Sequence, residues 1–162
     1  MSLDPAWTFA LTLAAALGSG LVAGVFFAFS AFVMKALARL PSGQGIAAMQ
    51  SVNVVVLNPW FLGVFLGTAL LSLLALASAW MQWGTPRAAW LAAGGVMYLA
   101  GCLGVTMSCN VPRNEALARI TPGSRGADAL WTDYLRTWTA WNHVRTLASL
   151  GAAAAFSLAL AA

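Results

Sequence analysis

The chain has 162 residues, which is enough for one domain. Hydrophobic residues make up 61% of it and charged residues only 7%, whereas roughly 25% of a soluble domain is charged. This composition excludes an ordinary soluble protein. The net charge of +4 comes from basic residues that form no patch, so we expect no nucleic-acid partner.

Four long runs without charge predict four membrane-spanning helices, at about residues 5–34, 57–80, 88–108 and 137–161. A run of about 18 or more apolar residues is long enough to cross the bilayer as a helix. We therefore expect an all-α protein, with one four-helix transmembrane domain over residues 1–162. Short amphipathic or extramembrane helical segments should lie between helices 1 and 2 and between helices 3 and 4. The first run follows Asp4, without Lys or Arg, and is too long for a signal peptide.

The basic residues predict the orientation of the chain in a cell membrane or inner membrane. Arg87 lies in the short loop between helices 2 and 3, and the other seven of the eight Lys and Arg residues follow helix 1 or lie between helix 3 and the start of helix 4. The tendency of basic loops to stay in the cytoplasm predicts that both larger loops are cytoplasmic and both termini are outside.

Proline-containing turns mark the ends of the predicted helices. Residues 41–45 form a turn, and Asn58-Pro59 opens the second membrane helix, where proline is tolerated in the first turn. Asn110-Val-Pro112 should end the third helix, and Thr121-Pro122-Gly123 predicts a further turn. The fourth helix should begin near Ala127, well outside the membrane.

Polar side chains concentrate where the second helix starts, the third ends and the fourth starts, all on one membrane face. Buried amides cost several kcal/mol unless they are hydrogen-bonded, so such a concentration favours a site. The alternative is that the asparagines cap helices and line turns, as this residue type often does. The set comprises Gln50, Asn53, Asn58, Asn110, Asn114, Asn142, His143 and Arg145.

The fourth helix carries aromatic, amide and basic side chains along one stripe, at about 100° per residue. An arginine at membrane depth needs a partner and is a functional candidate. Aromatic faces beside amides and a cation would suit a flat aromatic ligand with phenol or enolate oxygens, although Trp and Tyr also gather at membrane interfaces for amphipathic reasons alone. The stripe comprises Trp131, Tyr134, Leu135, Trp138, Asn142, Arg145 and Ser149, with Trp141 beside it.

The single histidine, His143, has two interpretations. Histidine is the residue type best suited to a general base near neutral pH. However, His143 lies roughly 120° around a regular helix from Trp131, off the main stripe. Both a catalytic and a structural role stay open at this point.

Several motifs together resemble the DUF1772, or anthrone oxygenase, family over nearly the whole chain. The pairing of an N-x-P-x-N stretch with a W-x-x-W-N-x-x-R stretch is the most specific of them. Lys35 departs from the proline that the family often has after Val-Met. The matching segments are Gly24-Val-Phe-Phe-Ala-Phe-Ser30, Val33-Met34, Ala48-Met49-Gln50, Asn53, Asn58-Pro59, Cys109-Asn110-Val-Pro112 with Asn114, and Trp138-Thr-Ala-Trp-Asn142-His-Val-Arg145-Thr146.

The resemblance implies a small four-helix membrane oxygenase that converts anthrones to anthraquinones with dioxygen, without a metal, flavin or other cofactor. In that chemistry a base removes a proton from the activated ring methylene, and the resulting carbanion reduces dioxygen. His143 would be the base, Asn142 and Arg145 would hold the ring oxygen as in an oxyanion hole, and the other candidates would bind the substrate. Those substrate-binding residues are Gln50, Asn53, Asn58, Asn110, Asn114, Trp138 and Trp141.

Two other classes of function compete with this interpretation. A haem- or quinone-binding redox protein could use His143 as an axial ligand, opposite Met34, Met107 or an open position. The chain has no paired histidines, no Glu-x-x-His and no Cys-x-x-Cys, so we expect no metal site of the usual kinds. A non-catalytic membrane subunit is the third class. The sequence leaves open the substrate and whether the protein is a homo-oligomer.

Overall fold

The computed structural model describes residues 5–162, and this part of the chain is entirely helical apart from turns and loops. Three of its segments are π-helices, named η1, η2 and η3, which continue neighbouring α-helices. The elements are α1 (Pro5–Ala28), η1 (Phe29–Val33), α2 (Met34–Leu37), α3 (Ser42–Val55), α4 (Pro59–Met81), α5 (Pro86–Val96), η2 (Met97–Gly104), η3 (Thr106–Asn110), α6 (Val111–Ala118) and α7 (Ala127–Ala161).

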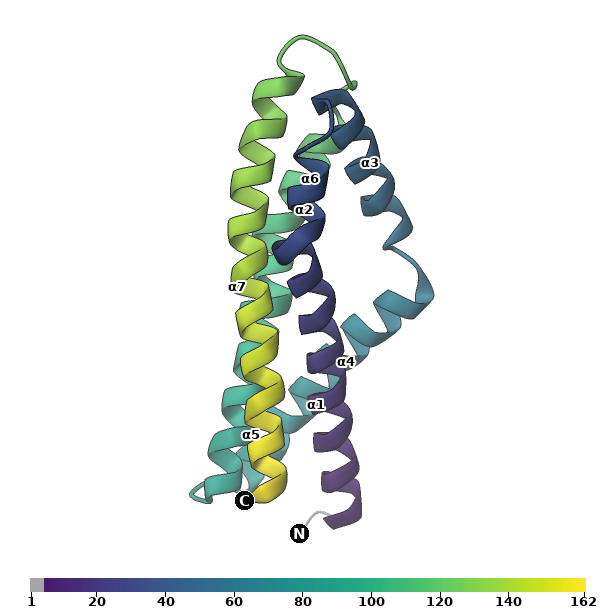
Figure 1. Ribbon diagram of the computed structural model, residues 1–162. Helices are drawn as coiled ribbons and strands as arrows, with labels where there is room; N and C mark the ends of the chain where they lie inside the picture. The colour runs from purple at the N-terminus through teal and green to yellow at the C-terminus, as the bar shows by residue number, and fades with distance from the viewer. Residues whose placement is uncertain (1–4) are drawn as a thin grey trace.

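Four of the resulting long helices are apolar and long enough to cross a bilayer, which confirms the all-α, four-span prediction. They cover Ala6–Leu37, Pro59–Met81, Pro86–Ala118 and Ala127–Ala161. Both described ends of the chain lie at the same end of the bundle, as an even number of crossings requires (Figure 1). The protein is therefore an integral membrane protein, and which face is cytoplasmic stays a prediction.

The third membrane helix does not end at Asn110-Val-Pro112 as predicted, and it continues to Ala118. Proline normally breaks a helix because it lacks the N–H and crowds the preceding turn. Here the π-helical segment η3 ends at Asn110 and α6 begins at Val111, so Pro112 stands in the first turn of a new α-helical register. A proline is tolerated in that position.

Small residues let the helices of the bundle approach closely. Gly94 and Gly101 of the third span face Phe156 and Ala148 of α7, and a Cβ built on Gly94 would lie 2.7 Å from the Phe156 ring. The buried core between these helices includes Tyr98, whose hydroxyl donates to the Phe65 carbonyl oxygen at 3.0 Å. The tight end of the bundle therefore lies around α5 and the second half of α7.

The opposite end of the bundle is an extramembrane layer in which α3 packs on α6 and α7. Gly45 allows this contact, because a Cβ there would lie 2.8 Å from the Trp131 ring. Ser42 also donates a hydrogen bond to Asp128 at the start of α7. The buried cluster of this layer comprises Met34, Ile46, Met49, Leu117, Ala127, Trp131, Tyr134 and Trp138.

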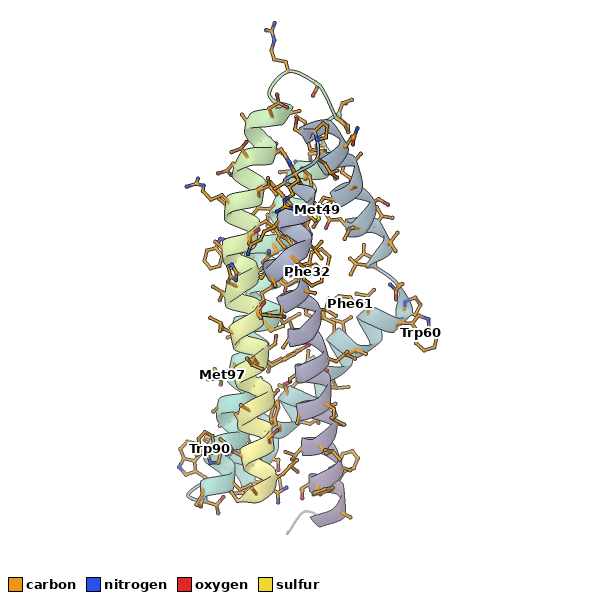
Figure 2. The ribbon with its side chains drawn as sticks, viewed as in Figure 1. Phe32, Met49, Trp60, Phe61, Trp90 and Met97 are labelled. Atoms are coloured by element: carbon orange, nitrogen blue, oxygen red, sulfur yellow. The ribbon has the colours of Figure 1, made fainter. Side chains whose placement is uncertain are left out.

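Helix α3 leads from the extramembrane layer out to a corner, where α4 begins apart from the rest of the bundle. Helix α4 then approaches the bundle along its length (Figure 1). Asn58 caps α4, and its side chain accepts from the backbone N–H groups of Trp60 and Phe61. Trp60 is 87% exposed and points away from the bundle, whereas Trp90 points outward near the other end (Figure 2). Tryptophan prefers membrane–water interfaces, so these residues mark the two bilayer surfaces.

Candidate functional site

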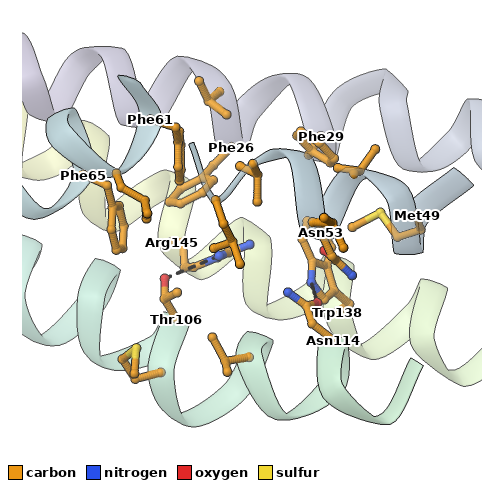
Figure 3. A pocket seen from close by; sticks show the side chains of 18 of the residues that line it. Phe26, Phe29, Met49, Asn53, Phe61, Phe65, Thr106, Asn114, Trp138 and Arg145 are labelled. Carbon is orange, nitrogen blue, oxygen red and sulfur yellow. Dashed lines mark hydrogen bonds between the residues drawn. The ribbon is translucent and has the colours of Figure 1, made fainter. Parts of the chain in front are cut away.

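A cavity of about 660 Å³ lies where α4 leaves the bundle. Its walls come from α1, η1, α3, α4, the third span and α7, and Figure 3 shows most of the side chains that line it. All three π-helical segments border or adjoin it, and π-helical turns are frequent at functional sites. The size is that of a pocket for a drug-sized ligand.

Arg145 supplies the only positive charge among the described residues that line the cavity. Its side chain is 5% exposed and forms no ion pair with any acidic side chain of residues 5–162. Nη2 donates to Asn142 Oδ1 at 2.6 Å and Nη1 to Thr106 Oγ1 at 3.4 Å, whereas Nε is buried without a partner. A buried cation without a counter-ion is costly, and its charge is free to act on a bound anion.

Aromatic rings hold the guanidinium in place. Its central carbon lies 4.1 Å from the centroid of the Phe26 ring and 5.1 Å from that of Trp138. Cation–π contacts of this kind stabilise a desolvated arginine. The charge is therefore fixed by the fold before any ligand arrives.

Asn142 supports Arg145 rather than lining the cavity. It is completely buried, and its Nδ2 donates to the Phe26 carbonyl oxygen at 2.7 Å and to Ser30 Oγ at 2.6 Å. Its Oδ1 then faces Arg145. This asparagine therefore joins α7 to the α1–η1 boundary and positions the arginine.

Three amide side chains, Gln50, Asn53 and Asn114, line the extramembrane side of the cavity. Asn114 Oδ1 accepts from the Tyr134 hydroxyl and from Trp138 Nε1, both at 2.8 Å, which leaves its Nδ2 without a partner among the described residues. Asn53 Nδ2 is buried without a hydrogen-bond partner among the described residues. Asn53 and Asn114 therefore lie beside Trp138, at one side of the Arg145 side chain (Figure 3).

Gln50 has a different role from its two neighbours. Its Nε2 donates to the carbonyl oxygens of Leu117 and Ile120, at 2.8 and 3.0 Å. These two bonds tie α3 to the end of α6 and close the extramembrane side of the cavity. Gln50 therefore lines the cavity while mainly holding its wall together.

The remaining wall is aromatic. Phe61 and Phe65 stack at 5.7 Å with an interplanar angle of 12°, and both contact the Phe26 ring edge-on. On α7, Trp138 lines the cavity and stacks on Tyr134 at 6.0 Å. A flat ring system could lie against these faces, since aromatic pairs prefer offset-stacked or edge contacts.

Besides Asn142, four other predicted site residues do not line the cavity. His143 is exposed on the outer side of α7, because it stands two residues, or about 200°, from Arg145 around the helix. Trp141 is 36% exposed and also points outward, next to buried Asn142. Asn58 uses its side chain to cap α4, and Asn110 Nδ2 donates to the Trp138 carbonyl oxygen at 3.2 Å, behind the cavity wall. His143 therefore lies outside this cavity.

Sequence reasoning missed the phenylalanines and Thr106. Phe61 and Phe65 are four residues apart on α4, the spacing that places two side chains on one helix face, and this pattern could have indicated a shared wall. Nothing in the local sequence of Thr106 indicated that it would accept a hydrogen bond from Arg145, because that contact depends on how the third span packs on α7.

The fold and the site together define a class of protein: a four-span membrane protein with a preformed aromatic cavity and a buried arginine that has no acidic partner within residues 5–162. The family model for anthrone oxygenase matches residues 58–155, more than half of the chain, and the chain belongs to this family. The matched region includes Thr106, Asn114, Trp138, Asn142 and Arg145. No curated protein and no solved structure matches the chain.

Proposed function

We propose that the protein is a membrane oxygenase that oxidises a flat phenolic or anthrone-type substrate with dioxygen. The observation that carries the proposal is Arg145, a buried guanidinium that faces an aromatic cavity and pairs with no carboxylate of the described residues. Membership of the anthrone oxygenase family supports an oxygenase-like activity independently of this geometry.

The cavity suits an aromatic ketone with an acidic methylene group. Its rings would lie against Phe26, Phe61 and Phe65, and its oxygen would face Arg145. Loss of a proton from the methylene group leaves a carbanion that is delocalised onto this oxygen. The Arg145 guanidinium and the free amide donor of Asn114 would stabilise the enolate, since preorganised donors in a water-poor site act strongly on developing charge.

The base for this step must differ from the predicted one, because His143 is outside the cavity. Glu115 is the only acidic side chain among the described residues that line it. Its side chain is 61% exposed and lies 3.8 Å from the exposed Arg119, so it can exchange protons with water. We assign the proton acceptor role to Glu115, with Asn142 as a positioning residue for Arg145.

The remaining steps balance without a further reductant. The enolate transfers one electron to dioxygen, and the resulting radical and superoxide combine into a peroxide anion at the former methylene carbon. The proton that Glu115 removed would return to this anion and give the hydroperoxide. Loss of the second C–H proton, with cleavage of the O–O bond, yields the ketone and one molecule of water. One oxygen atom therefore enters the substrate, and the other leaves as water.

The experiment is turnover of a dihydroxyanthrone by the purified protein in lipid vesicles under isotopically labelled dioxygen. The proposal predicts one labelled atom in each quinone formed and an equimolar uptake of dioxygen. Arg145→Lys in the same vesicles corrects for spontaneous oxidation of the anthrone. Oxidation no faster than in protein-free vesicles would refute the proposal.

The haem alternative has less support. The single histidine lies on the outer surface of α7, away from the cavity. Within residues 5–162, no three His, Cys, Asp or Glu side chains are grouped to hold a metal ion. Met49 and Met107 line the cavity, but no described histidine or cysteine joins them there as a second kind of axial ligand.

A further inference from the structure

We propose that the ligand enters the cavity sideways from the bilayer, between α4 and the η3–α6 segment, with Leu66 and Met107 as the two rims of the entrance. The chemical identity of the ligand rests on the proposed function. The route is inferred from the geometry of the entrance. Entry by this route implies that the substrate is a lipophilic molecule dissolved in the membrane.

Several residues line the cavity and are also exposed on the outer surface, which locates its opening. Leu66 is 52% exposed and Met107 61%, and nearer the extramembrane layer Val54 is 73% and Leu57 66% exposed. All four side chains are apolar. The opening is therefore bordered by groups that favour contact with hydrocarbon over water.

The opening exists because α4 packs on α1 and on the first part of the third span, but not on the η3–α6 part of that span. Its first half contacts α1 through Phe61 and Phe65, which pack on Phe26. Its second half packs on α5 and η2, but α4 has no substantial contact with η3 or α6. Figure 1 shows the same divergence, and the cavity fills the space it leaves.

The rims lie at membrane depth. Leu66 stands seven residues after Pro59, the first residue of its span, which is about 10 Å along the helix. Met107 stands eleven residues before Ala118, where the third span ends. Since the exposed Trp60 marks the nearby bilayer surface, the Leu66–Met107 entrance faces lipid chains rather than water.

The extramembrane edge of the same cavity provides the competing route. Glu115 and Ala118 line the cavity there and are exposed. However, Gln50 bonds the two carbonyl oxygens at the end of α6 and holds α3 across this edge. A ligand from water would have to pass the Glu115 carboxylate and this bonded layer, so the lateral route is favoured for a neutral ring system.

The test measures binding rather than turnover, with the full chain in lipid nanodiscs. The probe is a dihydroxyanthraquinone, which the proposed reaction cannot oxidise further and whose own fluorescence reports binding in a stopped-flow instrument. Leu66→Trp narrows the proposed entrance from the bilayer. Ala118→Trp narrows the competing entrance at the extramembrane edge. Leu70→Trp is the matched control, because Leu70 is 59% exposed one turn further along α4 and does not line the cavity.

Lateral entry predicts that Leu66→Trp slows association and dissociation together by roughly tenfold, with little change in Kd, because a gate alters both rates equally. Ala118→Trp and Leu70→Trp should leave both rates within about twofold. If Leu66→Trp does not fold, Met107→Trp narrows the same entrance from the other rim.

A rate slowed only by Ala118→Trp would overturn the lateral route, as would an association rate that follows the aqueous rather than the bilayer concentration of the probe. Quinone binding by the lateral route without any oxygen uptake from the anthrone would refute the proposed function alone. Absence of quinone binding would refute both.

Discussion

The side chain of Arg145 is held by Asn142, one turn earlier on the same helix, through a hydrogen bond of 2.6 Å. Asn142 in turn donates twice to the boundary between α1 and η1. The arginine is therefore fixed relative to two membrane spans at once. This preorganisation is what distinguishes it from an arginine that merely reaches the membrane surface.

Removing the support should loosen both the arginine and the contact between α7 and α1. We expect Asn142→Ala to lower the free energy of unfolding by about 1–3 kcal/mol, since it removes two interhelical bonds and one charge-assisted bond. The measurement is reversible unfolding in mixed micelles. Ser157→Ala is the control, because Ser157 donates only to the Ala153 carbonyl oxygen of its own helix. Equal losses in the two variants would contradict the role given to Asn142.

The contact of α3 with α7 depends on Gly45, which no side chain can replace without displacing the Trp131 ring. We expect Gly45→Ala to destabilise the protein by about 1–3 kcal/mol through overpacking. Gly63→Ala is the matched control, since a Cβ at Gly63 meets nothing within 4 Å. Thermal unfolding of both variants tests this, and a Gly45→Ala protein as stable as the control would show that α3 does not pack as described.

Two residues are candidates for the base: His143, which lies outside the cavity, and Glu115, which lines it. We expect His143→Ala to keep the rate of oxygen uptake within about twofold, because this side chain lies outside the cavity. Glu115→Gln should lower the rate by about 10²- to 10⁴-fold, the usual contribution of a general base. Steady-state oxygen uptake with an anthrone measures both. The reverse pattern would restore the histidine as the base.

The membrane spans could be predicted from the sequence because they depend on long uncharged runs, a property of local composition. The divergence of α4 could not, since it depends on contacts between helices that are distant in the sequence, such as those of Phe61 and Phe65 with Phe26. The continuation of the third span past Pro112 could not be predicted either. A π-helical turn before the proline changes the register in a way that residue type alone does not show.

The candidate site could be predicted only in part. The helical stripe correctly brought Trp138, Asn142 and Arg145 to one face of α7, because a regular helix has a fixed angle per residue. Asn58 was assigned to the site although a cap was the simpler expectation for an asparagine before proline. Contacts between distant helices, such as that of Thr106 with Arg145, depend on tertiary packing and need the structure.

The most direct test of the account is Arg145→Lys, assayed for oxygen uptake with an anthrone and for thermal stability on the same sample. Lysine keeps the charge but lacks the planar array of donors that reaches Asn142, Thr106 and a bound enolate together. We predict a loss of about 10²–10³-fold in turnover, the cost of one oxyanion donor, with a small change in melting temperature. Undiminished turnover in Arg145→Lys, or a loss that merely follows unfolding, would contradict the role of Arg145 as the oxyanion-binding group.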